Sequence, residues 1–201
     1  MLPLEGVTAF VLGTGPDLPT GHLHLLDGHF TVGVNRIWRC GFVPTVSLWI
    51  DGGIYEQAPE HFDRTLCVCD ESAKVRPEHI GLPVRPAPDG KLPRHLNPGR
   101  LVHLPNTGIV AALWAVSLGA YPVGLLGMGC KDDRRRPAQT DAMREARQAA
   151  LAMDYRPRGQ IFRSLWPMSG EASEFRHQMA SHYIQRCRPE DVARGVREFY
   201  R

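Results

Sequence analysis

Glycine and polar residues follow several short apolar runs of this sequence, and they are the first candidates for chemistry. Gly13, Thr14 and Gly15 come directly after the run Ala9–Leu12. Because glycine has no side chain, a phosphate or a ribose can approach the main chain closely at such a turn. These residue types at strand ends and helix starts are typical of a site for an anionic ligand. The other candidates of this kind are Asn35, Arg36, Asp51, Asn106, Thr107, Gly108 and Gly127.

The apolar runs that precede most of these residues predict buried β-strands. Each run is short, continuous and bounded by Gly, Pro, Asn or Asp, which is the pattern of strands in a parallel sheet. Helical patterns cover residues 107–118, 140–155, 170–187 and 188–201. The alternation predicts an α/β fold with a doubly wound, mostly parallel sheet and helices on both faces, a Rossmann-like arrangement. The predicted strands are VTAFVLG, HFTVGVN, TVSLWID, RTLCVCD, RLVHLPN, PVGLLGMG and GQIFRSLWP.

The length of 201 residues fits one nucleotide-binding α/β domain over residues 1–201. Residues 76–98 differ from the rest because they hold six prolines and few apolar residues. This segment is predicted to be a surface loop without regular structure. A loop of that length is either a lid or binding loop, or plain disorder.

Composition narrows the class of protein. The chain is 43% hydrophobic and 22% charged with a formal net charge of +3, so it reads as globular and mildly basic. Five cysteines without paired spacings indicate neither a zinc site nor a disulfide framework, which favours the cytoplasm. Cys67 and Cys69 alternate along a predicted strand and are expected to be small buried residues on one face. Nothing in the sequence predicts export or a membrane span, since no basic segment precedes the first apolar run.

The turn at Gly13–Gly15 matches neither of the common phosphate-binding motifs. The dinucleotide fingerprint needs a third glycine where this chain has Leu18, and no Gly-Lys-Ser/Thr follows as in a Walker loop. In open parallel sheets, however, ligands bind where the loops after neighbouring strands meet. A structural turn at the glycines and simple helix capping by Asn106 or Thr107 are the alternatives. The helix starts that follow Gly15 and Asn106 are expected at the same edge of the sheet, and two such helix starts favour an anionic ligand there.

Two charged features leave alternatives open. Asp51 could hold a ribose hydroxyl or a metal, although Asp before Gly-Gly is also an ordinary turn. The run Lys131–Arg136 could neutralise a leaving diphosphate with its three arginines, or it could be a solvated loop. The histidines show no spacing typical of a metal site, so no metal ligands are predicted.

A set of short motifs occurs in a recognisable order. They are FVLGTGPDL, VGVNR, NTGIVAALWAVSLGAYPVGLLGMG and IFRSLWPMS. This set resembles the bacterial sialyltransferase-like fold of glycosyltransferase family 42 and the related MptE-like domains. The resemblance covers roughly the first 170 residues as ordered motifs, with the middle loop unmatched.

The resemblance implies roles for matching residues. Gly13, Thr14 and Gly15 would approach a nucleotide phosphate, and Asn35 would contact phosphate or sugar. The base or ribose would lie against Thr107 and Gly108, and Ser169 would lie near a late turn. Members of the sialyltransferase kind take a sugar from CMP, so a CMP-linked donor is the family expectation. The MptE-like kind transfers diphosphate from ATP to a hydroxymethylpterin.

The chain departs from the family pattern at its general base. The stretch RRRPAQTD holds no histidine where the sialyltransferase kind has one. The remaining candidates for the catalytic group are Asp132, Asp133 and His177. The family's acidic residue in the strand-ending G-x-D is replaced by Gly129, and Asp17 stands where the family has serine.

The sequence therefore predicts a nucleotide-binding transferase, most simply a glycosyltransferase that moves a sugar from a nucleotide donor to an acceptor hydroxyl. One alternative is diphosphate transfer from ATP, with Mg²⁺ bridging carboxylates such as Asp51, Asp132 and Asp133. Another is a nucleotide-binding module without catalysis. The acceptor is open, and the basic charge allows a nucleic acid.

Overall fold

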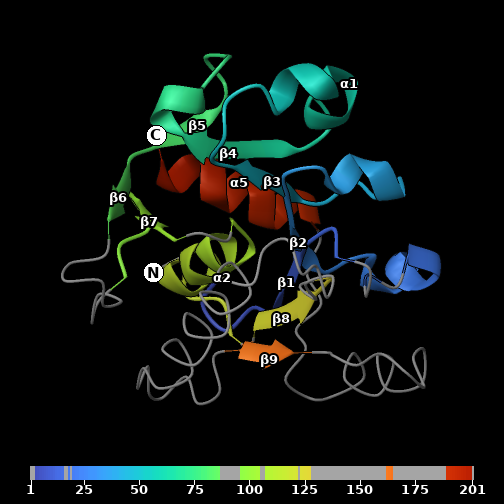
Figure 1. The fold of residues 1–201 in the computed structure, drawn as a ribbon. Coiled ribbons are helices and arrows are strands. Elements are labelled where there is room, and N and C mark those ends of the chain that lie inside the picture. The colour runs from blue at the N-terminus through green and yellow to red at the C-terminus, as the bar shows by residue number, and fades with distance from the viewer. Residues whose placement is uncertain are drawn as a thin grey trace, which may run out of the picture.

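The computed structural model describes residues 3–15, 18, 20–86, 96–104, 107–121, 123–127, 162–164 and 189–200. Its main feature is a seven-stranded sheet with the order β5-β4-β3-β2-β1-β8-β9, in which every strand pair is parallel. Figure 1 shows these strands stacked from β5 at the top to β9 at the bottom. Their bounds are β1 Ala9–Leu12, β2 Phe30–Val34, β3 Val46–Trp49, β4 Leu66–Asp70, β5 Ile80–Leu82, β8 Val123–Leu126 and β9 Phe162–Ser164.

The strands in the middle of the sheet are buried on both faces, which explains their continuous apolar runs. Every residue of β1, β2, β3 and β8 is buried. Along β1, Ala9 and Val11 pack toward one hydrophobic cluster, and Phe10 and Leu12 pack toward another. Layers on both sides of a parallel sheet are what this pattern predicts, so the predicted α/β, Rossmann-like fold is confirmed.

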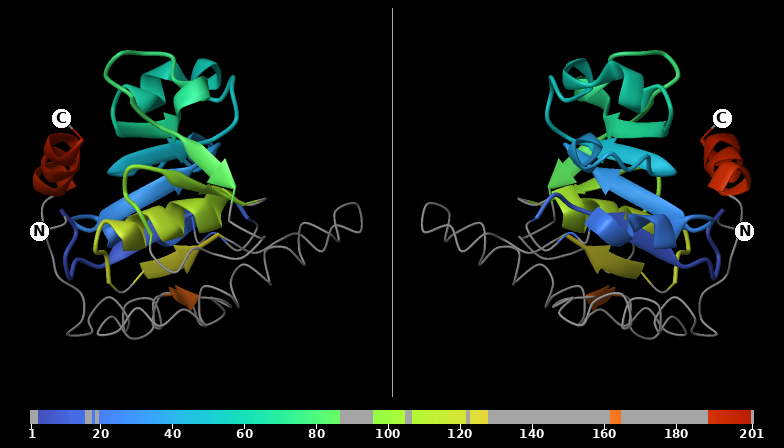
Figure 2. Two further views of the ribbon diagram at one scale, coloured as in Figure 1. Left: turned by 90° about the vertical axis from the view of Figure 1, so that its left-hand side faces the viewer. Right: turned by 90° about the vertical axis from the view of Figure 1, so that its right-hand side faces the viewer.

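One face of the sheet is covered by α2, Thr107–Ser117. This helix is buried from Gly108 through Ser117, as its nearly all-apolar sequence predicts. The helix ends before Gly119, whose φ of 95° is a conformation that favours glycine. The cluster on this face also takes in Val196 of the last helix, α5, Pro189–Phe199. Figure 2 shows α5 lying beside the ends at which the strands begin.

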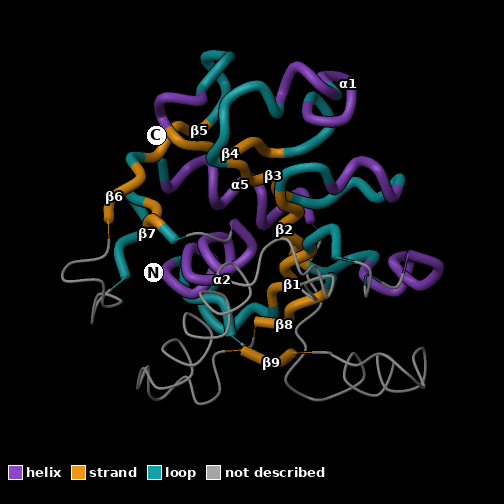
Figure 3. Tube along the Cα trace, viewed as in Figure 1, coloured by secondary structure: helices purple, strands orange, loops and turns teal. Residues whose placement is uncertain are grey.

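The opposite face is covered by short helices, as Figure 3 shows to one side of the strands. Leu23 and Leu26 pack under β1 together with Ile37, and Tyr55 and Phe62 pack under β3 and β4. These connections are 3-10 turns and one α-helical turn rather than the longer helices of many α/β folds. Their bounds are η1 Thr20–Leu26, η2 Ile37–Cys40, η3 Tyr55–Gln57, α1 Pro59–Phe62 and η4 Glu71–Ala73.

The direction in which strands are added reverses at β1. From β1 the chain runs outward through β2, β3, β4 and β5, and it then returns to place β8 on the other side of β1. Leu12 consequently lies opposite Gly33 of β2 and opposite Leu126 of β8. The segments that follow these strands leave the sheet side by side. A reversal of this kind is where ligands bind in open α/β sheets.

The prediction that residues 76–98 lack regular structure is wrong for their first part. Ile80–Leu82 forms the edge strand β5, and Val84–Pro86 forms β6, which pairs with β7, Leu101–His103, in a separate two-stranded sheet. The sequence RLVHLPN therefore forms a strand, but outside the main sheet. Proline is tolerated at strand ends and on edge strands because its missing N–H is not needed there, and this explains how such a proline-rich segment pairs. Residues 87–95 lie outside the described residues, as do the predicted helices 140–155 and 170–187.

Candidate functional site

The turn after β1 is locked to the end of β8. The Gly13 N–H donates to the carbonyl oxygen of Leu126 at 2.8 Å, and the Gly15 N–H donates to that of Gly127 at 2.7 Å. These two amides are therefore used within the fold and are not open to a phosphate. Thr14 between them is exposed. A ligand at this turn would meet Thr14 and the main chain rather than a free pair of glycine amides.

Gly127 is required by packing. Its φ is 63°, and a Cβ at this position would lie 2.6 Å from the carbonyl oxygen of Gly13 and 2.9 Å from Cβ of Leu18. Leu18 stands where the dinucleotide fingerprint has its third glycine, and its side chain rests directly on Gly127. Packing alone thus explains why position 127 is a glycine. The predicted contact of Gly127 with a cofactor stays a prediction.

Asn35 and Thr107 meet at the carboxyl edge of the sheet although they are far apart in the sequence. Asn35 follows β2, and its Nδ2 donates to Oγ1 of Thr107 at the start of α2, at 3.3 Å. Its backbone N–H donates to the carbonyl oxygen of Leu48 at 3.1 Å. Asn35 also has a φ of 50°, which asparagine tolerates better than most residues.

The second polar atom of this side chain is unpartnered within the described residues. Oδ1 of Asn35 is buried and accepts no hydrogen bond from any of them. A buried acceptor without a donor costs about 1–3 kcal/mol. A group that donates to this oxygen would remove the cost, so Asn35 is the candidate residue with the clearest unmet requirement.

Arg36 and Asp51 lie at the same edge but are exposed. Nε of Arg36 donates to Oε1 of Gln57 at 3.1 Å, and Nε2 of Gln57 donates to the carbonyl oxygen of Gly53 at 2.9 Å. This chain of contacts holds Arg36 over the turn that follows β3. Gly108, next to Thr107, is buried within α2.

Five of the predicted site residues lie outside the described residues. They are Asn106, Asp132, Asp133, Ser169 and His177. Within the described ranges, no cluster of three or more His, Cys, Asp or Glu side chains could hold a metal ion. The proposed catalytic groups therefore stay predictions.

Two cavities lie at the opposite edge of the sheet, where the strands begin. The larger has a volume of about 870 Å³ and the smaller about 470 Å³, and Arg197 of α5 lines both. Neither cavity is lined by a predicted site residue. Sequence reasoning missed the larger cavity because its residues come from segments that precede β4 and β5 and from α5. Among them are Asp63, Cys67, Lys74, Arg76, His79 and Arg197.

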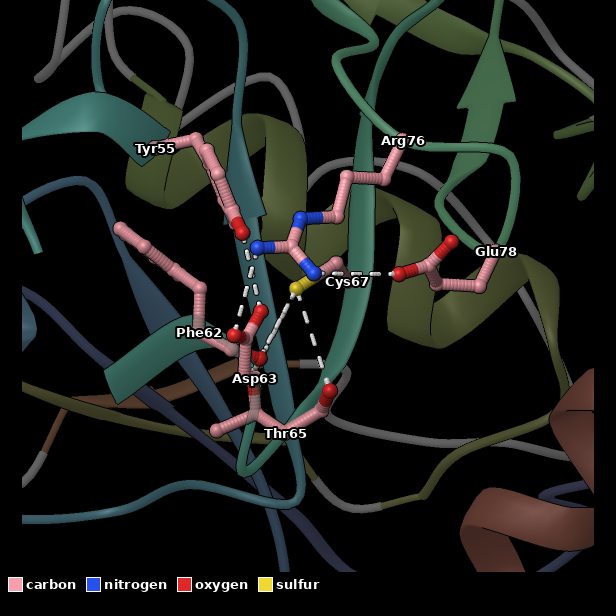
Figure 4. A network of polar contacts seen from close by, with 7 residues as sticks. All are labelled: Tyr55, Phe62, Asp63, Thr65, Cys67, Arg76 and Glu78. Carbon is pink, nitrogen blue, oxygen red and sulfur yellow. Dashed lines mark hydrogen bonds and ion pairs between the residues drawn. The ribbon is translucent and has the colours of Figure 1, made fainter. Parts of the chain in front are cut away.

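A polar network borders the larger cavity (Figure 4). The hydroxyl of Tyr55 donates to Oδ1 of Asp63 at 3.0 Å. Arg76 pairs with Asp63 at 3.5 Å and with Glu78 at 3.7 Å, and its guanidinium lies 5.1 Å from the centre of the Tyr55 ring. One arginine thus neutralises both carboxylates and is held in place by an aromatic face.

Cys67 and Cys69 are buried in the hydrophobic cluster that contains Tyr55 and Phe62. This confirms that they are small buried residues on one face of β4. Sγ of Cys67 donates to the carbonyl oxygen of Phe62 at 3.3 Å. Burial raises the pKa of Cys67 to about 11 and that of Cys69 to about 12. Both therefore remain thiols at neutral pH and are poor nucleophiles. Together with Cys40 they are free cysteines.

Burial lowers the pKa of His61 and of His79. The unfolded chain binds these protons near a pKa of about 6.5, whereas the folded chain binds them only at lower pH. Stability is then complete above that value and falls as the pH drops below it. We expect urea unfolding at mildly acidic pH to show a lower free energy than at neutral pH, and His79→Phe to reduce this difference.

The matched control for this pH dependence is His103→Gln, because His103 is exposed at the end of β7. It should leave the difference between the two pH values unchanged. An equal reduction by both substitutions would show that the buried histidine does not cause the pH dependence.

Comparisons with models of protein families, with curated proteins and with solved structures found no match. The described part of the chain contains no helix with the length and apolar character needed to span a bilayer. The cytoplasmic location stays a prediction.

Proposed function

We propose that this protein is a nucleotide-binding transferase that moves a glycosyl group from a nucleotide-linked donor to an acceptor hydroxyl. The observation that carries the proposal is the hydrogen bond between Asn35 and Thr107, with Oδ1 of Asn35 left unpartnered, beside the reversal of strand order at β1. Ligands of open parallel sheets bind at this edge and at this kind of reversal.

The donor would lie across the ends of β1 and β2. A sugar hydroxyl or an amino group of the base would donate to Oδ1 of Asn35, since Nδ2 is already bonded to Thr107. Thr14 would face the phosphate side, and Gly108 would let the ligand approach the start of α2. Gly13, Gly15 and Gly127 would shape this edge through the bonds that tie β1 to β8.

The chemical step is the part that rests on the resemblance. Asp132, Asp133 or His177 would accept the proton of the acceptor hydroxyl, and Ser169 would lie near the donor. Developing phosphate charge would be met by the start of α2 and by arginines. A CMP-linked sugar is the first donor to test, and Mg²⁺ is an optional component of the assay.

The screening experiment measures thermal shifts with CMP-, UDP- and dTDP-sugars and with ATP plus Mg²⁺. A shift with a nucleotide-sugar, followed by sugar transfer or donor hydrolysis, supports the proposal. Metal-dependent consumption of ATP would replace it with diphosphate transfer. A shift without turnover would reduce it to a binding module, and no shift with any nucleotide would end it.

Asn35→Gly is the variant that tests the placement of the site. Glycine adopts a positive φ without strain, so the substitution removes the amide and keeps the backbone. We expect affinity for the nucleotide that protects the wild type to fall about tenfold, because the ligand group that donates to Oδ1 is left unsatisfied, which costs about 1–3 kcal/mol. Titration of the thermal shift or calorimetry measures this.

The matched control is Asn97→Gly, in the segment before β7. Like Asn35, Asn97 forms a side-chain hydrogen bond, since its Oδ1 accepts the Gly99 N–H at 2.8 Å, but it belongs to no predicted site. It should leave nucleotide affinity unchanged. If Asn35→Gly binds as tightly as the wild type, the nucleotide does not lie at the end of β2.

A further inference from the structure

The larger cavity at the amino edge has the size of a ligand site. Its volume of about 870 Å³ lies within the range of small-molecule pockets, about 300–1,000 Å³. It is bordered by the segments that lead into β4 and β5 and by the last turn of α5. Apolar groups form one part of its lining, and those with accessible surface are Pro77, Ile80 and the ring of Tyr200. None of the residues of the proposed nucleotide site takes part.

The charges around this cavity do not balance. Both of its carboxylates, Asp63 and Glu78, are paired with Arg76. Lys74 and Arg197 also line the cavity, and neither forms an ion pair with any of the described residues. Both cations are exposed, and they give the cavity a positive balance that favours a negatively charged ligand.

His79 provides a second, independent indication of a ligand. It lines the cavity and is only 5% exposed, yet its Nδ1 is buried and has no hydrogen-bond partner in the described part of the chain. Its ring is held in place by Trp49, with ring centres 5.4 Å apart, and by Tyr55 at 5.0 Å. A buried polar atom without a partner calls for an explanation in a folded protein, and a bound group that supplies the hydrogen bond is one such explanation.

We propose that this cavity binds a small organic anion, whose phosphate or carboxylate groups are attracted by Lys74 and Arg197 and whose apolar body packs on Pro77, Ile80 and the ring of Tyr200. His79 contributes a hydrogen bond to the ligand. Arg76 is positioned by Tyr55, Asp63 and Glu78 and limits the site on one side (Figure 4). The site lies at the edge opposite to the proposed nucleotide site and does not depend on it.

The test uses the full chain and four probes in calorimetry at low salt. Phenyl phosphate and phthalate carry an apolar body and an anionic head, inorganic phosphate lacks the body, and benzyl alcohol lacks the charge. We expect the first two to bind with a Kd of about 1 mM or tighter, and inorganic phosphate and benzyl alcohol to bind much more weakly. Equal binding of inorganic phosphate would overturn the apolar part of the proposal. Failure of both organic anions to bind would overturn all of it.

Two variants test the named residues. The double substitution Lys74→Gln and Arg197→Gln should weaken phenyl phosphate at least about tenfold, since two charge-assisted contacts are lost. His79→Phe keeps the aromatic packing and should also weaken binding. The double substitution Arg39→Gln and Arg85→Gln is the charge-matched control, because both arginines are exposed and neither lines a cavity. Equal weakening by this control would mean unspecific attraction and would overturn the site.

Asn35→Gly separates this site from the proposed nucleotide site. It should leave the binding of phenyl phosphate unchanged even where it abolishes nucleotide binding. A loss of phenyl phosphate binding in Asn35→Gly would place the anion at the carboxyl edge and contradict the proposal.

Discussion

Gly127→Ala is expected to lower the free energy of unfolding by about 2–5 kcal/mol. A side chain at φ 63° costs about 1–2 kcal/mol, and the new Cβ would lie 2.6 Å from the carbonyl oxygen of Gly13. Relieving such a clash in a packed region typically costs a further ~1–3 kcal/mol. The carbonyl belongs to the turn that holds β1 against β8, so the backbone itself must move. Urea denaturation of the variant and the wild type measures the effect.

Two other glycines separate the causes. Gly53 has a φ of 73° with nothing within 4 Å of a built Cβ, and Gly52 has open space without a positive φ. Gly53→Ala should therefore show only the backbone cost, about 1–2 kcal/mol, and Gly52→Ala almost none. If Gly127→Ala is no worse than Gly53→Ala, the close contact between the β1 and β8 ends is absent in solution.

Trp114→Ala is expected to lower the free energy of unfolding by about 3–5 kcal/mol and to release α5. Trp114 is 2% exposed on α2, and its Nε1 donates to the hydroxyl of Tyr200 at 3.0 Å. That hydroxyl in turn donates to the carbonyl oxygen of Pro98. Loss of the indole removes both the packing and the first bond of this relay. Urea denaturation measures the stability, and hydrogen exchange of residues 189–200 measures the release of α5.

Tyr200→Phe tests the relay without opening a cavity. It keeps the ring and removes the hydroxyl, so we expect a loss of about 1–3 kcal/mol from the Trp114 N–H that is left without an acceptor. Exchange of the α5 amides should rise less than in Trp114→Ala. Unchanged exchange in Trp114→Ala would contradict the docking of α5 through this tryptophan.

Strands with long apolar runs could be predicted from the sequence because burial on both faces leaves few polar residues in them. The runs around β1, β2, β3, β4 and β8 are of this kind. The helix at 107–118 was equally readable, since it starts at Thr107 and ends before Gly119. Short edge strands carry much less signal. In Ile80–Leu82 only Leu82 is fully buried. The prolines around this strand therefore favoured the prediction of a loop.

The candidate site could be predicted only in part, for a similar reason. Strand ends and helix starts pointed to Asn35 and Thr107, but no local pattern indicates that they bond to each other. The glycines after β1 suggested free amides, whereas those of Gly13 and Gly15 are bonded to β8, whose position depends on the whole topology. The cavity at the amino edge joins residues 62–82 with α5, a pairing that no spacing in the sequence reveals.

The place of β1 in the sheet matters for how the chain is made. β1 can pair with β2 soon after both have left the ribosome, but its other edge waits for β8, which is synthesised after all of β2 to β7. Until then that edge presents unpaired N–H and C=O groups between apolar faces, which is a template for other chains. The nascent protein is thus most open to aggregation in the interval between the synthesis of β2 and that of β8, and it is in this interval that a chaperone would protect it most.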